Sequence, residues 1–393
     1  MIGYYGSTAR GLPGADAPPD DFRVRVRAHA ADLVAAVPAA ERERRFPRAA
    51  VERLGGAGLL RERWAAPDAR LGAIFAEELG RAGTGGIGLG LTVHLEAALS
   101  IVLRHGATPL LRRVGDEALA GSSLLAVAAS EAGGGSDLAS VGTTARRDGD
   151  SLCIRGTKRY VSLGASADHL IVTCRPEPPA RGGLMLVLVP RDQVRIEKRL
   201  ATAGVRSIET ARVSIDARVP TAATIAEGRA GMLALSWGLT HERLATAALV
   251  VGTASLAVGL AVAHLARRHV GGAPLLERQA LRLRVAEHAA HIDALSRAVH
   301  SLAAAGLGDS RTTREVAGLK ATAARVGERA VSDCMHFFGG RGYVEDESPL
   351  ARLWRDVRAA RIGAGTDEMM WELVAGGLVP ADAAYDALVE PEE

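Results

Sequence analysis

The feature that most constrains the fold is one long segment without a formal charge, at residues 245–266. Its sequence, ATAALVVGTASLAVGLAVAHLA, is long enough for a membrane-spanning helix. The segment is rich in Ala, Gly, Thr and Ser, carries His264 and is flanked by charged helical sequence, so its hydrophobicity per residue is modest. We therefore expect a helix buried on all faces within a bundle or a subunit interface, and no membrane span.

The pattern of the sequence changes twice along the chain. Apolar residues recur at helical spacing in 21–120, short β-rich runs separated by turn residues fill 121–225, and helical spacing returns in 226–393. Residues 1–20 are rich in Gly, Pro and Asp and lack the pattern of a signal peptide, which predicts a flexible leader. This order predicts a mainly α protein with a central β domain and argues against a doubly wound sheet.

Charge and cysteine content exclude several function classes. The 393 residues include 48 Lys and Arg against 45 Asp and Glu, a net charge of +3, without a run of five basic residues, so nucleic-acid binding is not expected. Lysine occurs only at Lys158, Lys198 and Lys320, a bias typical of a GC-rich genome that makes single arginines weak signals. The three cysteines lie far apart, which fits a cytoplasmic protein and predicts no metal site.

A glycine motif at residues 83–88 matches the GxGxxG pattern of dinucleotide-binding proteins. A helical segment precedes it where that fingerprint requires a strand, and no acidic residue follows in the required role. We therefore expect a loop between two helices.

Two strand-turn segments offer groups suited to a planar or anionic cofactor. In ASEAGGGSD (129–137) a strand runs into a Gly-rich turn with Ser130 and Ser136, whose N–H and hydroxyl groups suit a phosphate or a flavin edge. A surface loop explains this pattern equally well. In GTKRYVSLG (156–164) Tyr160 and Ser162 are expected on the same face of a strand, which suits stacking plus a hydrogen bond. An ordinary cross-strand pair is the commoner explanation.

A carboxylate stands where the long uncharged segment begins. Glu242 shares one helix face with Leu239, Thr246 and Leu249. Desolvation on such a face would raise its pKa, which suits a base that removes a weakly acidic C–H proton near neutral pH. A helix that simply begins at the surface is the plainer alternative.

Three further segments expose a cation or backbone groups. Arg268 precedes a Gly-Gly turn and is suited to pair with a pyrophosphate. The sequence FGGRGY (338–343) is a second exposed turn, and IGAGTDE (362–368) opens the last long helix, where free N–H groups favour an anion.

Taken in this order, these segments resemble the acyl-CoA dehydrogenase family over about residues 21–388. The resemblance rests on ASEAGGGSD, GTKRYVSLG, HERLA, ARRHVGGAPLLERQ, HFFGGRGY, LWRDVRAARI and GAGTDE. It implies an N-terminal helical domain, a middle β-barrel domain and a C-terminal four-helix bundle. It also implies one FAD per subunit, a homotetramer or dimer, and an electron-transfer flavoprotein as redox partner.

The resemblance further implies roles for residues at matching positions. Contacts with FAD are implied for Ala129, Ser130, Gly135, Ser136, Tyr160, Ser162, Arg268, Gln279, His336, Gly339, Gly340, Thr366 and Glu368. Among these, His336, Gly339 and Gly340 match the segment that reaches the FAD of a neighbouring subunit. Substrate contacts are implied for Ser136, Arg243 and Gly363.

The position of the catalytic glutamate in most members is Ala364 in this chain. Members specific for isovaleryl-CoA and long-chain substrates carry the glutamate on the first helix of the C-terminal bundle, just before an arginine, and Glu242-Arg243 matches that placement. The resemblance therefore implies Glu242 as the base for the α-proton. The backbone N–H of Ala364 would donate to the thioester carbonyl.

The expected function is FAD-dependent α,β-dehydrogenation of a short or branched acyl-CoA, in fatty acid or branched-chain metabolism, since Gly363 and Ala364 leave space for the acyl group. Thr240 replaces an acid common near CoA, and RERWAAPDARL is shorter than usual. These departures leave open an acyl or aminoacyl thioester bound to a carrier protein in secondary metabolism. A flavin-dependent monooxygenase on the same fold and a non-catalytic binding protein are the other classes considered.

Overall fold

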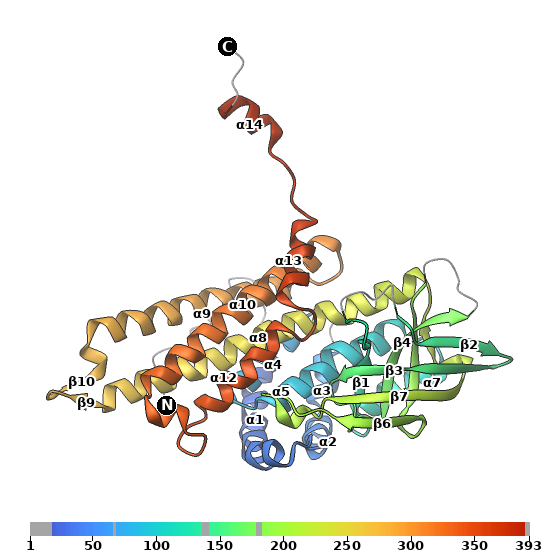
Figure 1. Ribbon diagram of the computed structural model, residues 1–393, viewed down its shortest axis with the longest axis horizontal. Coiled ribbons are helices and arrows are strands. Elements are labelled where there is room, and N and C mark those ends of the chain that lie inside the picture. Colours follow the sequence, from blue (N-terminus) through green and yellow to red (C-terminus); the bar gives the residue numbers. More distant parts are fainter. Residues whose placement is uncertain (1–17, 66–67, 136–140, 178–182, 390–393) are drawn as a thin grey trace.

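The computed structural model describes residues 18–65, 68–135, 141–177 and 183–389. Figure 1 shows helices, then a β domain at one end of the molecule, then long helices that run its length. The predicted fold class, mainly α with a central β domain, is confirmed. The predicted leader lies almost wholly outside the described residues.

The N-terminal part is entirely helical. It comprises α1 (Pro18–Glu43), α2 (Ala49–Gly56), α3 (Leu59–Arg63), α4 (Arg70–Ala82), α5 (Gly86–Thr92), a π-helical segment (Val93–Leu99), α6 (Ser100–His105) and α7 (Pro109–Leu119). The hydroxyl of Thr108 caps α7 by accepting from the Leu111 N–H, and Pro109 occupies its first turn. Of the predicted loop at 83–88, residues 83–85 do form the loop between α4 and α5, whereas residues 86–88 already belong to α5. Gly83 and Gly85 both have positive φ.

The β domain is one mixed sheet. Its strands are β1 (Leu125–Ala128), β2 (Thr144–Asp148), β3 (Ser151–Val161), β4 (His169–Glu177), β5 (Met185–Pro190), β6 (Val194–Arg199), β7 (Ala211–Pro220) and β8 (Thr224–Ala226). The order is β6-β7-β3-β2-β4-β5-β8, and β1 pairs with β4 in parallel. Burial alternates residue by residue along β7, so one face of the sheet covers the core.

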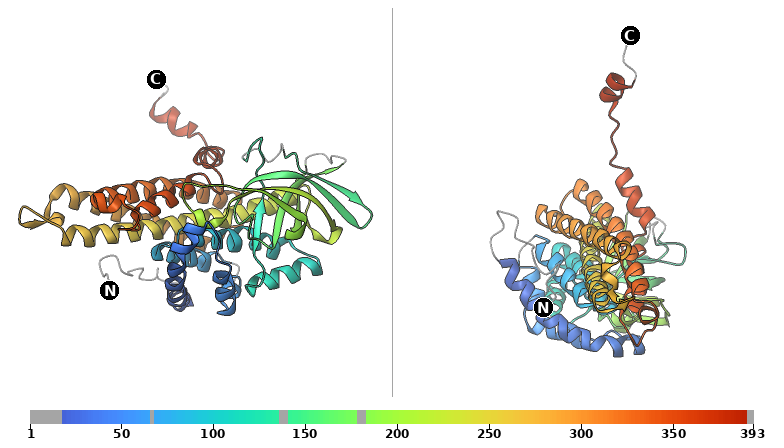
Figure 2. Two further views of the ribbon diagram at one scale, coloured as in Figure 1. Left: turned by 60° about the horizontal axis from the view of Figure 1, so that its bottom comes forward. Right: turned by 90° about the vertical axis from the view of Figure 1, so that its left-hand side faces the viewer.

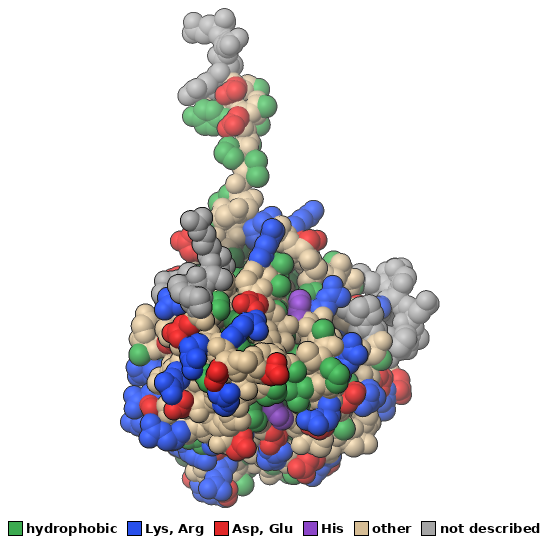
Figure 3. All heavy atoms as spheres, turned by 90° about the vertical axis from the view of Figure 1, so that its right-hand side faces the viewer, with side chains coloured by type: hydrophobic (Ala, Val, Ile, Leu, Met, Phe, Trp, Pro, Cys, Tyr) green, Lys and Arg blue, Asp and Glu red, His purple; other side chains and the backbone are tan. Residues whose placement is uncertain are grey.

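The C-terminal part is a bundle built around one helix of 39 residues, α8 (Arg229–Arg267). It continues through the hairpin β9 (His269–Val270) and β10 (Ala273–Pro274), then α9 (Gln279–Ala305), α10 (Ser310–Phe337), α11 (Gly340–Tyr343), α12 (Leu350–Arg358), α13 (Asp367–Ala375) and α14 (Asp382–Leu388). Figure 2 shows the long helices of the bundle lying side by side, with α14 projecting away from the body. On the face in Figure 3, basic and acidic side chains are interspersed.

Two helical stretches, 86–105 and 229–267, have the length and hydropathy of membrane spans. Most of each apolar window is nevertheless buried inside the protein. The expectation of a buried helix therefore holds for most of the uncharged segment within α8.

Glycines let α8 approach α4 closely. A Cβ at Gly80 would lie 2.1 Å from the Leu249 carbonyl oxygen, and a Cβ at Gly252 would lie 2.1 Å from that of Glu77. Neither distance is possible for a real side chain, so each glycine is required where the two backbones cross. This contact fixes α8 against the N-terminal helices.

Replacing Gly252 with alanine is expected to lower the free energy of unfolding by about 1–3 kcal/mol, because α4 and α8 must move apart. Urea denaturation measures the change. Gly259→Ala is the matched control on the same helix, since nothing lies within 4 Å of its new Cβ. That control should keep or raise stability, by up to about 1 kcal/mol, through helix propensity. Equal losses in both variants would contradict the close crossing.

Candidate active site

The predicted site residues fall into two groups at different ends of the bundle. The first group comprises Ala129, Ser130 and Gly135 after β1, Tyr160 and Ser162 at the end of β3, Glu242 and Arg243 on α8, and Gly363, Ala364, Thr366 and Glu368 before and within α13. The second, called here the distal group, comprises Arg268, Gln279, His336, Gly339 and Gly340. Ser136 lies outside the described residues.

A buried ion pair holds the loop that follows β1. The ammonium of Lys158, which is fully buried, lies 2.8 Å from Glu131 Oε1 and also donates to Thr173 Oγ1 at 2.9 Å. Glu131 accepts further hydrogen bonds from the Thr143 hydroxyl and from the Gly142 N–H. The carboxylate therefore ties this loop to β3 and to the segment leading into β2.

The same hydrogen bonds decide the charge of Glu131. Burial alone would raise its pKa, but the bonds from Lys158, Thr143 and Gly142 outweigh burial and lower the pKa to about 2. Glu131 is thus a carboxylate at any physiological pH. Sequence analysis missed this pair; the signal available was a rare lysine in an arginine-rich chain.

Tyr160 lies in an irregular part of β3. The register against β7 shifts between Lys158 and Val161, and Tyr160 has a left-handed backbone with φ of 59°. The expectation that Tyr160 and Ser162 share one face of a strand is therefore wrong, because β3 bulges and ends at Val161. The bulge leaves the Tyr160 ring 57% exposed.

The β1 loop and the β3 bulge adjoin each other. The Arg159 N–H donates to the Ser130 carbonyl at 2.8 Å, next to the exposed Tyr160 ring. A Cβ at Gly135 would lie 2.7 Å from Ser130 Oγ, whereas Gly133 and Gly134 face open space. A hydroxyl, small residues and an exposed aromatic ring thus lie at one edge of the β domain, and these groups suit a planar polar ring.

Glu242 lies one third of the way along α8 with its side chain half-buried. None of the described residues donates a hydrogen bond to its carboxylate or forms an ion pair with it. Burial raises the pKa of Glu242 to about 7, against the opposing effect of the nearby cations Arg243 and Lys320. A carboxyl group in this state can accept a proton near neutral pH.

The turn at 362–366 faces α8 and α10. Ala364 and Gly365 have φ of 55° and 107°, and their carbonyls accept from Arg243 Nε at 2.9 Å and Lys320 Nζ at 2.5 Å, respectively. Within the described part of the chain, the N–H groups of Ala364 and Gly365 have no acceptor. Thr366 caps α13 by accepting from the Met369 N–H. Two backbone donors are therefore available beside the Glu242 helix turn.

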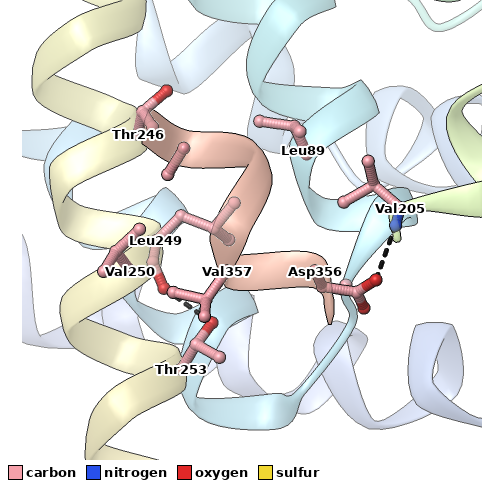
Figure 4. Close-up of a pocket in the computed structure, with 10 residues that line it drawn as sticks. Leu89, Val205, Thr246, Leu249, Val250, Thr253, Asp356 and Val357 are labelled. Atoms are coloured by element: carbon pink, nitrogen blue, oxygen red, sulfur yellow. Dashed lines mark hydrogen bonds between the residues drawn. The ribbon is translucent and has the colours of Figure 1, made fainter. Parts of the chain in front are cut away.

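The face of α8 that carries Glu242 continues into a small hollow, shown in Figure 4. The hollow is lined by Gly85, Leu89, Val205, Thr246, Leu249, Val250, Thr253, Asp356, Val357 and Ala360. It encloses about 30 Å³, enough for roughly one water molecule or a methyl group. Burial raises the pKa of Asp356 at its edge to about 6. The hollow is apolar except for this carboxyl and two threonines.

The distal group cannot reach the residues around Glu242 within one chain. Arg268 directly follows α8, 26 residues after Glu242, which corresponds to about 39 Å along a helix. Gln279 begins α9 soon after the β9–β10 hairpin, and His336 lies near the end of α10, where the Phe338 ring stacks on His264 at the end of α8. The positions implied to contact one FAD are therefore divided between two remote places.

Comparison with known proteins identifies the middle and C-terminal parts of the chain. Residues 126–217 match the model of the acyl-CoA dehydrogenase middle domain, and residues 229–379 match that of the acyl-CoA dehydrogenase C-terminal domain. The chain is 41% identical over 358 residues to an acyl-acyl-carrier-protein dehydrogenase, MbtN, of Mycobacterium sp. (strain MCS), covering 89% of this chain and 91% of that one.

Two more distant proteins complete the comparison. The mitochondrial short-chain specific acyl-CoA dehydrogenase of Bos taurus is 29% identical, with 86% of this chain and 84% of that protein covered. The crystal structure of an acyl-CoA dehydrogenase from Geobacillus kaustophilus has a TM-score of 0.84 at 26% identity, covering 93% of this chain and 99% of its own.

Glu131→Gln is expected to lower the free energy of unfolding by about 3 kcal/mol at pH 7, because Lys158 would keep a buried charge without its counter-ion. The pKa of Glu131 is lower in the folded state, so its stabilisation is complete above the ordinary value of 4.5 and is lost as the pH falls toward 2. The free energies of unfolding of wild type and variant, measured by urea denaturation, should therefore converge as the pH falls over that interval.

Glu315→Gln is the control for this variant, since Glu315 pairs with Arg311 on the exposed surface of α10. Its loss should stay below about 1 kcal/mol at every pH. A pH-independent difference between wild type and Glu131→Gln would contradict the assigned ion pair.

Proposed function

The chain belongs to the acyl-CoA dehydrogenase family, and we propose that it oxidises the Cα–Cβ bond of an acyl thioester carried by an acyl carrier protein. The relative at 41% identity is named for carrier-bound acyl groups, and the relative named for short-chain acyl-CoA is 29% identical. This favours the carrier protein over the short or branched acyl-CoA that the sequence alone predicted.

The observation that carries the proposal is that the 362–366 turn is bound to α8 next to Glu242, through the hydrogen bond from Arg243 to the Ala364 carbonyl. Glu242, with a pKa raised to about 7 by burial, is suited to accept the α-proton of a thioester. The N–H groups of Ala364 and Gly365, which have no acceptor among the residues that the structure describes, are suited to bind the thioester oxygen as negative charge develops on it. Donors fixed in advance stabilise the enolate without reorganisation during the reaction.

Proteins of this family are FAD-dependent, and the chain offers a fitting place for the flavin. Ser130, the space beside Gly135 and the exposed ring of Tyr160 would hold its ring system, while the capped start of α13 at Thr366 offers a further polar edge. The bound flavin would supply the acceptor for the β-hydrogen, which leaves as a hydride. The residues of the chain bind and orient the thioester and move the α-proton.

The first turns of α8 suit the approach of a carrier-bound arm. Met232, Ser236, Leu239 and Arg243 follow one another at helical spacing, from the exposed end of α8 toward the 362–366 turn. Thr240, which stands where relatives of this family often carry an acid, is buried and donates to the Ser236 carbonyl at 2.8 Å. This approach therefore presents apolar and neutral polar groups before it reaches Arg243, and it carries no acid at residue 240.

The distal group supports an assembly in which each flavin site is shared. Arg268, Gln279 and His336 are too far from Glu242 to serve the same site in one chain, so we assign them to the flavin of a second copy. A homodimer or homotetramer would satisfy this arrangement. An electron-transfer flavoprotein is the redox partner that the family resemblance implies.

The proposed function is tested by anaerobic titration of the purified protein with one acyl group presented on an acyl carrier protein and on CoA, while the flavin absorbance is recorded. We expect the carrier-bound thioester to bleach the flavin with a rate per concentration at least tenfold higher. Faster bleaching by the CoA ester would identify acyl-CoA, and not the carrier-bound thioester, as the substrate. Bound flavin that neither ester bleaches would favour the monooxygenase, and absence of flavin would leave a binding protein.

Glu242→Gln is expected to keep FAD but to lose flavin reduction by at least about 1000-fold, because no base remains for the α-proton. In the wild type the rate should rise with pH around an apparent pKa near 7, as Glu242 becomes a carboxylate. Stopped-flow absorbance measures both. Glu287→Gln, an exposed change on α9, is the control and should leave the rate unaltered.

The same variant carries a stability readout. Because the folded-state pKa of Glu242 lies above its ordinary value of 4.5, the unfolded state ionises first as the pH rises, and the wild type loses stability between pH 4.5 and about 7. Glu242→Gln should therefore unfold at a higher temperature than wild type at alkaline pH and lose that advantage at acidic pH. A less stable, inactive variant would speak against a catalytic role.

A further inference from the structure

Lys320 is a fully buried lysine on α10 that sequence analysis did not connect to the site. Its ammonium donates to the Gly365 carbonyl at 2.5 Å, which is its single hydrogen-bond acceptor among the described residues. Burial lowers the pKa of Lys320 to about 8, although nearby carboxylates favour its charged form. Burying a cation with one hydrogen-bond acceptor costs folding free energy, which points to a function for Lys320 at this position.

Lys320 and Arg243 donate hydrogen bonds to the 362–366 turn from two different helices. Arg243 on α8 holds the Ala364 carbonyl, and Lys320 on α10 holds the next carbonyl, that of Gly365. The two peptide planes that follow Ala364 and Gly365 are therefore both fixed, because a planar peptide turns as one unit with its carbonyl.

These two hydrogen bonds hold a strained stretch of backbone in place. Ala364 is not glycine, yet its φ is 55°, and Gly365 follows with φ of 107°. Such a conformation in a residue with a Cβ persists only where the surroundings impose it, and it is typical of sites where strain serves function. The peptide that Arg243 holds carries the N–H of Gly365, and the peptide that Lys320 holds carries the N–H of Thr366. Within the described part of the chain, the N–H groups of Ala364, Gly365 and Thr366 have no acceptor.

We propose that Lys320 is a positioning residue of the active site, which holds the 362–366 turn through the Gly365 carbonyl so that the turn's N–H groups receive the thioester oxygen. This inference rests on the proposed function. Lys320 does not itself touch the reacting atoms, and it adds to the roles of Glu242 and Ala364 without replacing either.

The charges around Lys320 predict a second effect. Glu242 and Arg243 face it from α8, and Asp367 with its partner Arg361 faces it from the start of α13. The charges of Lys320 and Arg243 lower the pKa of Glu242, against the effect of burial. Removal of the Lys320 charge should therefore raise the pKa of Glu242 above about 7 and move the pH profile of flavin reduction upward.

The test compares Lys320→Met with Lys198→Met, the same change at an exposed lysine on β6. Flavin reduction by the carrier-bound thioester is followed anaerobically from pH 6 to 9. For Lys320→Met we expect FAD to be retained, the limiting rate to fall at least tenfold, the half-saturating thioester concentration to change less than threefold, and the midpoint of the pH profile to rise. Lys198→Met should behave as wild type.

Lys320→Gln separates the two effects, because the amide can still donate to Gly365 but carries no charge. It should recover part of the limiting rate at high pH and keep the raised midpoint. If Lys320→Met does not fold, the Lys320→Gln variant alone provides the test. An unchanged rate and midpoint in a folded Lys320 variant, or a loss confined to thermal stability, would overturn the proposal. A wild type that no thioester reduces would instead overturn the proposed function, and this inference with it.

Discussion

The close burial of α8 is the constraint on which the rest of this structure depends. Gly80 and Gly252 bring the backbones of α4 and α8 into contact, and the uncharged stretch of α8 then lies between the N-terminal helices and the bundle. The helix can carry almost no charge where it is covered this closely. Glu242 stands at the edge of this region, so the packing that stabilises the fold also supplies the desolvation that raises the pKa of this carboxyl.

Two buried lysines act at the parts of the site that have little regular structure. Lys158 ties down the loop after β1 through Glu131, and Lys320 ties down the 362–366 turn through Gly365. An ammonium is a compact group with three donors on a flexible stem, whereas a guanidinium is planar and wider. In a chain whose other cations are nearly all arginine, these lysines occupy places that call for a small buried donor.

Much of the fold followed from local pattern. The order of helical and β segments, the buried helix and the loop at residues 83–85 are confirmed because periodicity and turn residues act over short stretches. The bulge at Tyr160 did not follow, because strict alternation carries no sign of an extra residue. The Lys158–Glu131 and Lys320–Gly365 contacts join residues far apart in sequence, which pattern does not pair. The roles of the individual site residues remain predictions.

The length of α8 has a further consequence for how this chain tolerates change. The helix carries Glu242 one third of the way along it and leads directly to Arg268 after its last turn, without an interruption that could absorb an error in spacing. One inserted or deleted residue between them would turn the two ends by about 100° relative to each other and shift them by about 1.5 Å. Such a change would also displace Gly252 from its crossing with α4. Insertions and deletions should therefore be confined to loops, because the length of α8 sets the distance between Glu242 and Arg268.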